Sequence, residues 1–149
     1  MPEQVTRTII VKAPVAEVYD IWANFQNFPH FMKYITSVRE TGDGLSHWTM
    51  EGPLGKQIEW DAETTRMERD KRIAWNSRGS GDITTSGQVT FKELPHNETE
   101  IAVTLQYVPP AGALGEAVAK IFSDPAEQLE EDLKNFKAYA EGLQERTAS

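Results

Sequence analysis

The sequence predicts an α+β domain in which a curved antiparallel sheet of about seven strands wraps around one long carboxy-terminal helix, with two short helices after the first strand. Segments that alternate apolar and polar residues follow one another through the middle of the chain, separated by short turn signals. Such turns between consecutive strands indicate an antiparallel meander. A long stretch with helical periodicity closes the chain, and a helix against an antiparallel sheet is an α+β arrangement.

Three elements are predicted before the meander. The β-branched segment 6–12 is typical of a strand. A helix over 14–23 follows, because Pro14 suits a first helical turn and apolar residues recur after it at helical spacing. Pro29 predicts a second short helix over 29–34, within a stretch rich in aromatic residues.

The six strands of the meander predict one apolar and one polar face, because successive side chains of a strand point to opposite sides. Three of the four tryptophans, Trp48, Trp60 and Trp75, share the apolar face. Glu59, Asp61 and Glu63 form a row on the polar face, so we expect them in solvent rather than as an acid–base pair. The strands are predicted at 36–41, 45–51, 57–66, 72–78, 86–94 and 99–108.

The closing helical region carries one continuous apolar stripe, which is expected to meet the apolar face of the sheet. Asp124 to Glu127 has the pattern of a helix start, with an N-cap, a proline and a capping-box glutamate, so we expect a break there. The stripe consists of Leu114, Val118, Ile121, Phe122, Leu129, Leu133, Phe136, Ala140 and Leu143.

The composition is typical of a single globular domain and argues against disulfide-bonded and membrane-spanning proteins. The 149 residues suit one domain, 1–149, and 39% hydrophobic with 26% charged residues is typical of globular chains. There is no cysteine, which excludes disulfides and thiolate chemistry. No apolar run reaches the ~20 residues that span a bilayer, and the amino end lacks a secretory pattern, so we expect a cytoplasmic protein without stable membrane insertion.

The charge balance argues against two kinds of partner. The formal net charge is −8 and the sequence pI about 4.9. Binding to nucleic acid draws most of its affinity from lysine and arginine on phosphates, and anionic membranes attract basic segments. We therefore expect neither nucleic acid nor an anionic membrane surface as a partner.

Several motifs in matching order resemble the START-like, or SRPBCC, superfamily of helix-grip proteins and, within it, the polyketide cyclase/dehydrase-type family. The resemblance implies a deep cavity between the concave face of the sheet and the long helix, closed at one end by the short helices. The motifs are IIVKAPVAEVYDIW (9–22), NFPHFM (27–32), HWTMEGPLG (47–55), EWDAE (59–63), IAWNS (73–77), SGQVTF (86–91), YVPPAGALG (107–115) and DPAEQLEEDLKNFK (124–137).

Alternation and the resemblance together predict the residues around a bound ligand. We expect the mouth of the cavity to be framed by segments 24–34, 79–82 and 109–112. The expected ligand-binding residues are Phe28, Phe31, Met32, Trp48, Met50, Trp60, Trp75, Ser77, Phe91, Leu105, Tyr107, Leu114, Val118 and Phe122.

Polar groups on the apolar face permit two interpretations. Ser46, Thr64, Ser77 and Tyr107 lie there by alternation. They either anchor a ligand, as polar groups in apolar pockets do, or satisfy local backbone groups. The spacing of the three histidines matches no metal site, so neither a metal nor a cofactor is expected.

The favoured function is binding of an apolar or aromatic small molecule, of lipid, isoprenoid or polyketide type, without chemistry. The alternative is a cyclase/dehydrase-type enzyme that catalyses aldol cyclisation or dehydration. In it Tyr107 is the proton donor, Arg7 stabilises an enolate, and His30 is a further candidate that lacks an evident partner. A third possibility is a protein that acts through its surface. The sequence leaves the oligomeric state open.

Overall fold

The computed structural model describes residues 3–51, 55, 57–79, 84–108 and 125–148. These residues form seven strands, two α-helices and a 3-10 helix, which confirms the predicted α+β class. In chain order they are β1 (Glu3–Val11), α1 (Val15–Ala23), η1 (Phe25–His30), β2 (Ile35–Gly42), β3 (Leu45–Glu51), β4 (Gln57–Glu68), β5 (Arg72–Arg78), β6 (Thr84–Leu94), β7 (Glu98–Val108) and α3 (Pro125–Ala148).

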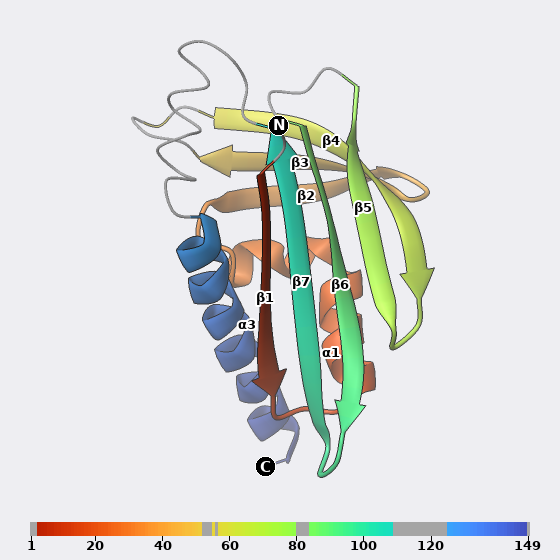
Figure 1. Ribbon diagram of the computed structural model, residues 1–149, viewed down its shortest axis with the longest axis vertical. Helices are drawn as coiled ribbons and strands as arrows, with labels where there is room; N and C mark the ends of the chain where they lie inside the picture. Colours follow the sequence, from red (N-terminus) through yellow and green to blue (C-terminus); the bar gives the residue numbers. More distant parts are fainter. Residues whose placement is uncertain (1–2, 52–54, 56, 80–83, 109–124, 149) are drawn as a thin grey trace.

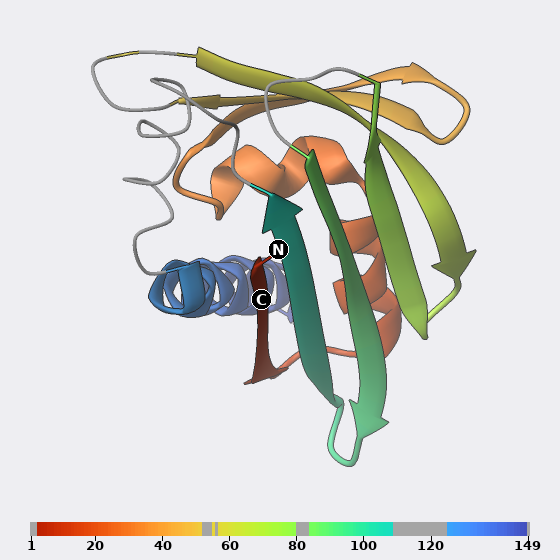
Figure 2. The same cartoon turned by 45° about the horizontal axis from the view of Figure 1, so that its top comes forward.

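The seven strands form one antiparallel sheet in the order β1-β7-β6-β5-β4-β3-β2. The sheet is sharply bent: β1, β7, β6 and β5 run side by side, and β2 and β3 cross above them (Figure 1). A register shift between Thr64 and Arg66 interrupts the pairing of β4 with β5. Strand β4 itself bends along its length (Figure 1). The helices lie inside this bend (Figure 2).

The predicted strands are confirmed, with ends that differ by up to three residues, but the second short helix is misplaced. The chain forms a 3-10 helix over Phe25–His30 instead of a helix over 29–34. The Asn24 side chain starts it, because its Oδ1 accepts a hydrogen bond from the Gln26 backbone N–H at 3.3 Å. Pro29 therefore lies inside the helix rather than at its start.

The 3-10 geometry explains the aromatic spacing of this segment. Three residues per turn place side chains at i and i+3 above one another. Phe25, Phe28 and Phe31 follow this spacing, and all three are buried. Neighbouring pairs of these rings have centroids 5.3 Å apart. The segment is thus a stack of rings that faces the interior.

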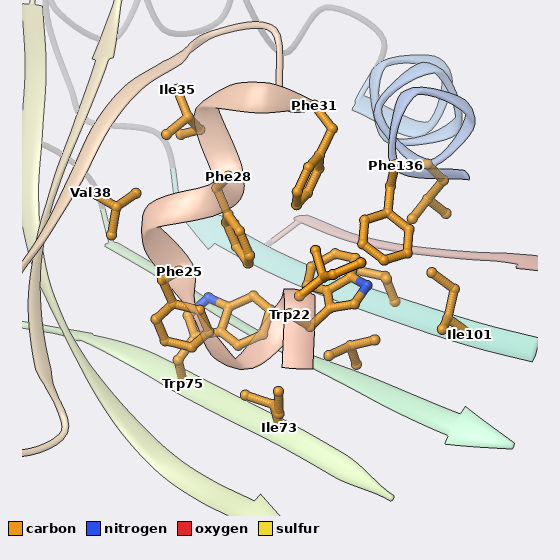
Figure 3. Close-up of a cluster of buried hydrophobic side chains, with 14 of the residues drawn as sticks. Trp22, Phe25, Phe28, Phe31, Ile35, Val38, Ile73, Trp75, Ile101 and Phe136 are labelled. Carbon is orange, nitrogen blue, oxygen red and sulfur yellow. The ribbon is translucent and has the colours of Figure 1, made fainter. Parts of the chain in front are cut away.

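The deepest part of the core is centred on Trp22 of α1, which is fully buried. Its ring centroid lies 5.1 Å from that of Phe28 and 5.0 Å from that of Phe136 on α3 (Figure 3). Phe31 packs against the same indole at 5.7 Å. Helix α3 is therefore joined to α1 and η1 through one cluster of rings.

Helix α3 begins at Pro125, where the sequence predicted a helix start. Its inward stripe is confirmed, because Leu129, Leu133, Phe136 and Ala140 are all buried. Leu114, Val118, Ile121 and Phe122 lie outside the described residues. No described helix is both long enough and apolar enough to cross a bilayer.

Two polar side chains of α3 attach this helix to the end of β1. The Lys137 ammonium donates a hydrogen bond to the carbonyl oxygen of Ile10 at 2.9 Å. The Lys12 backbone N–H donates to Oε2 of Glu141 at 2.8 Å. These contacts fix where the carboxy-terminal half of α3 lies on the sheet.

Candidate functional site

The concave face of the sheet is lined by the tryptophans that alternation placed there. Trp48, Trp60 and Trp75 are all buried. Trp48 pairs with Trp60 across β3 and β4, and the two rings stack with centroids 5.9 Å apart. Phe25 and Phe28 of η1 contact the Trp48 ring at 5.7 and 5.2 Å. One end of the concave face is therefore closed by η1.

The structure describes the side chains of ten of the fourteen predicted ligand-binding residues, and it places all ten on the interior side. Eight of them belong to the sheet or to η1. Tyr107 pairs with Thr85 in β7, but its side chain, like Leu114, Val118 and Phe122, lies outside the described residues. Buried are Phe28, Phe31, Trp48, Met50, Trp60, Trp75 and Phe91; half-buried are Met32, Ser77 and Leu105.

A glycine that the sequence reading missed determines where Trp75 lies. Gly87 pairs with Trp75 across β5 and β6. A Cβ on Gly87 would lie 2.6 Å from Cζ2 of Trp75 and 2.9 Å from Cδ2 of Leu105. The indole therefore covers the bare backbone of Gly87, and a glycine inside a strand was the signal for such a close approach.

Two of the hydroxyl groups on the concave face satisfy local groups. Oγ of Ser46 accepts a hydrogen bond from Nε1 of Trp48 at 2.8 Å. Oγ of Ser77 accepts one from the Thr85 backbone N–H at 2.9 Å. The oxygens of these two residues thus hold an indole and a strand end in place.

Two of the candidate catalytic groups lie at the surface. Arg7 is exposed, and its Nη1 donates to the carbonyl oxygen of Thr6 at 2.7 Å. His30 is exposed, and its ring stacks on that of Tyr139 of α3 with centroids 5.4 Å apart. Both side chains are therefore held by neighbours at the edge of the protein, in contact with water.

The carboxylate of Asp132, on α3, is half-buried. Oδ1 of Asp132 accepts hydrogen bonds from the Lys33 backbone N–H at 3.3 Å and from Nε2 of Gln128 at 3.0 Å. Burial raises the pKa of Asp132 to about 6, although both hydrogen bonds lower it. Nδ2 of Asn135 donates to the carbonyl oxygen of Phe31 at 3.3 Å. This edge of α3 thus holds the backbone that leaves η1.

The convex face carries the predicted polar residues. Glu59 and Asp61 are exposed, as expected, but His47 is only half-exposed, because its two ring nitrogens lie 3.0 Å from Oε1 of Glu59 and 2.8 Å from Oδ1 of Asp61. Hydrogen bonds to Glu59 and Asp61 raise the pKa of His47. No group of described histidines and carboxylates has the arrangement of a metal site.

Comparison with known proteins gives a consistent result. The family model for polyketide cyclase / dehydrase and lipid transport matches residues 11–134. An uncharacterised 17.2 kDa protein of Streptomyces lincolnensis is 31% identical over 138 residues, which cover 93% of this chain and 89% of that protein.

Two solved structures show the same fold at low identity. The ZhuI aromatase/cyclase of Streptomyces sp. R1128 superposes with a TM-score of 0.74 at 18% identity, covering 95% of this chain and 94% of that one. A START superfamily protein of Mycobacterium smegmatis gives 0.70 at 17% identity, covering 94% and 98%. Both likenesses concern the fold, a START-like helix-grip architecture.

Proposed function

The chain belongs to the polyketide cyclase/dehydrase and lipid transport family, and on this premise we propose that it binds an apolar or aromatic small molecule between the concave face of the sheet and α3. The ligand class is a lipid, an isoprenoid or a polyketide. The protein holds this molecule without transforming it. The predicted mouth, at segments 24–34, 79–82 and 109–112, remains part of the proposal.

The observation that carries the proposal is the chemistry of the interior. Among the described residues that are buried, the polar ones are Ser46, Thr49 and Thr99, and none is charged. Apolar walls with a few hydroxyl groups are typical of sites that bind apolar molecules. General acid–base catalysis needs a titratable group within reach of the substrate. The described interior is therefore better suited to binding than to proton transfer.

The placement of two candidate catalytic groups also favours binding over the enzyme alternative. Arg7, the candidate for enolate stabilisation, is exposed and donates to a backbone carbonyl. His30 stacks on Tyr139 at the surface. An oxyanion is stabilised most strongly by donors in a site that excludes water. Neither group occupies such a position.

The first test is native mass spectrometry of the protein purified from its own host. We expect an apolar molecule to co-purify and to leave when the protein is denatured. Displacement by a fluorescent apolar probe then measures affinity, with the tryptophans as an internal reporter. Protein that carries no ligand and takes up no apolar probe would contradict the proposal.

A pair of variants on one strand locates the site. Ala62 is buried on the concave side of β4, and its neighbour Asp61 is exposed on the convex side. Ala62→Leu should reduce probe binding, because the added atoms fill space beside the tryptophans, whereas Asp61→Leu should leave it unchanged. Thermal unfolding of both variants shows whether each remains folded. Equal probe binding by two folded variants would place the site elsewhere.

Two further expectations from the sequence remain proposals. We propose that the protein is cytoplasmic, a location that its lack of cysteine favours. We also propose that it binds no nucleic acid, since its net charge of −8 opposes contact with phosphates. Fractionation of the host, and electrophoretic mobility of DNA and RNA with the purified protein, test these two points.

A further inference from the structure

A cavity lies where the β2–β3 turn meets the junction of α1 and η1. It has a volume of about 220 Å³. Its apolar wall consists of Ala23, Phe25, Leu45 and Met67. We call it the turn pocket. It is smaller than most ligand sites, which measure roughly 300–1,000 Å³, so an occupant has a short body.

Phe25 belongs both to the lining of the turn pocket and to the aromatic core. Its ring contacts Trp48 at 5.7 Å and Trp75 at 6.0 Å between centroids. The same side chain lines the pocket together with Met67, which is 52% exposed. A thioether and an aromatic ring in one lining make a surface that accepts a small apolar body.

A hydrogen-bond donor is available in the wall of this pocket. Ser46 lines it and is only 4% exposed. The Ser46 oxygen accepts the Trp48 indole N–H, while no described residue accepts the hydrogen of its hydroxyl. Thr64 contributes a second hydroxyl to the same wall. A molecule in the pocket can therefore make a polar contact that the protein leaves open.

Two carboxylates complete the lining. Glu40 pairs with Ser46 across β2 and β3, so both side chains project from the same side of the sheet. Asp43 belongs to the turn itself. Within the described part of the chain neither carboxylate forms an ion pair. The two negative charges thus stand at an apolar pocket without a cation.

We propose that the turn pocket binds a small organic cation, a primary ammonium compound with a short apolar body. The ammonium lies between Glu40 and Asp43, and the body lies against Phe25 and Met67. The aromatic ring adds an attraction for the cation. None of the residues that line the turn pocket is among the fourteen expected ligand-binding residues of the proposed function.

A structural role for Glu40 is the competing explanation. Strand β2 is at the edge of the sheet, and inward charges on edge strands prevent pairing with other chains. This role predicts that Glu40→Gln associates more readily and that no cation binds. The proposal predicts saturable binding by the unmodified monomer, so a binding measurement distinguishes the two.

The test uses the full chain with ¹³C in its methionine methyl groups. Met67 reports on the turn pocket, whereas Met50 lies on the concave face and reports on the proposed ligand site. Benzylamine, which is protonated at neutral pH, should shift the Met67 signal saturably and leave Met50 in place. Benzyl alcohol and benzoate, of similar size, should bind at least about fivefold more weakly.

A double variant with a charge-matched control tests the carboxylates. Glu40→Gln with Asp43→Asn should weaken benzylamine binding about fivefold, since two partly solvated charge contacts are lost. Glu93→Gln with Glu98→Gln changes the net charge equally at the β6–β7 turn and should have no effect. Equal weakening by both pairs, equal binding of the alcohol, or an unmoved Met67 signal overturns the proposal. A shift of Met50 alone also overturns it, while leaving the proposed function intact.

Discussion

The two faces of the sheet are built from alternate residues of the same strands, yet different forces hold them. On the concave face Trp48 stacks on Trp60, with η1 packed against them. On the convex face, one residue along the same strands, His47 lies between Glu59 and Asp61. Ring packing removes area from water, whereas exposed ion pairs contribute little. Substitutions on the two faces should therefore differ several-fold in their effect on stability.

The largest expected effect lies in the core that the concave face encloses. Trp22→Ala should lower the free energy of unfolding by about 3–5 kcal/mol, because it leaves a cavity among Phe28, Phe31 and Phe136. The matched substitution on the convex face, Thr104→Ala, removes one exposed hydrogen bond to Thr6. It should lower the free energy of unfolding by no more than about 0.5 kcal/mol. Urea unfolding measures both, and similar losses would refute the comparison.

The next largest effect on stability comes from adding a single methyl group to a glycine. Gly87→Ala should destabilise the protein by about 1–3 kcal/mol, because the new Cβ overlaps the Trp75 ring. Gly142→Ala, in α3, meets no atom within 4 Å and should stabilise it by about 0.5–1 kcal/mol through helix propensity. Near-ultraviolet circular dichroism should change for the first variant alone. A Gly87→Ala protein as stable as the parent would show that Trp75 moves freely.

The next effect concerns Asp132, a carboxylate whose pKa is raised by burial. A carboxylate on the convex face is solvated and lacks this effect. The pKa of Asp132 is raised to about 6, so the stability that it contributes is present below its unfolded value near 3.8 and is lost as pH rises through 6. Asp132→Asn is neutral throughout, and its Oδ1 can still accept from Lys33 and Gln128. The free energy of unfolding of Asp132→Asn should exceed that of the parent by about 1–2 kcal/mol at pH 7. Near pH 4 the two proteins should be equally stable.

Unfolding curves at several pH values measure this difference. Glu131→Gln, at the neighbouring exposed position, is the control and should change stability little at any pH. A constant difference between Asp132→Asn and the parent from pH 4 to pH 7 would mean that Asp132 does not titrate in this range.

The smallest effect belongs to the convex face. Hydrogen bonds to Glu59 and Asp61 raise the pKa of His47, so its contribution is present below the unfolded value near 6.5 and fades as pH rises through the folded one. His47→Gln should lower the free energy of unfolding by at most about 1 kcal/mol at pH 6, and by less at pH 8. Salt should diminish the difference. Titration of the His47 ring by NMR checks the direction of the shift.

Most of the architecture could be predicted because it depends on local patterns. Alternation placed Trp48, Trp60 and Trp75 on one face, and the structure confirms all three. The start of α3 at Pro125 was likewise marked by a local capping pattern. The predicted helix over 29–34 is misplaced, because proline favours a helix start, whereas the spacing of Phe25, Phe28 and Phe31 fits the three residues per turn of η1.

The site was less predictable. Arg7, which the enzyme alternative requires beside the substrate, belongs to the edge strand β1, and its side chain is exposed. Asp132 accepts a hydrogen bond from the backbone N–H of Lys33, 99 positions earlier, and no local pattern marks this contact. The turn pocket joins residues of α1, η1, β2, β3 and β4, which no local pattern connects.

The sequence by itself determined the order of the elements, the apolar stripe of α3 and, for each strand, which side chains point to the apolar face of the sheet. These follow from periods of two and 3.6 residues, which short segments encode. Only the tertiary structure decided that Trp75 covers Gly87 and that Ser46 accepts the Trp48 indole N–H. The same holds for the hydrogen bond from the Lys33 backbone N–H to Asp132 of α3. Contacts of this kind depend on the bend of the sheet and on packing between distant segments, and both are properties of the whole fold.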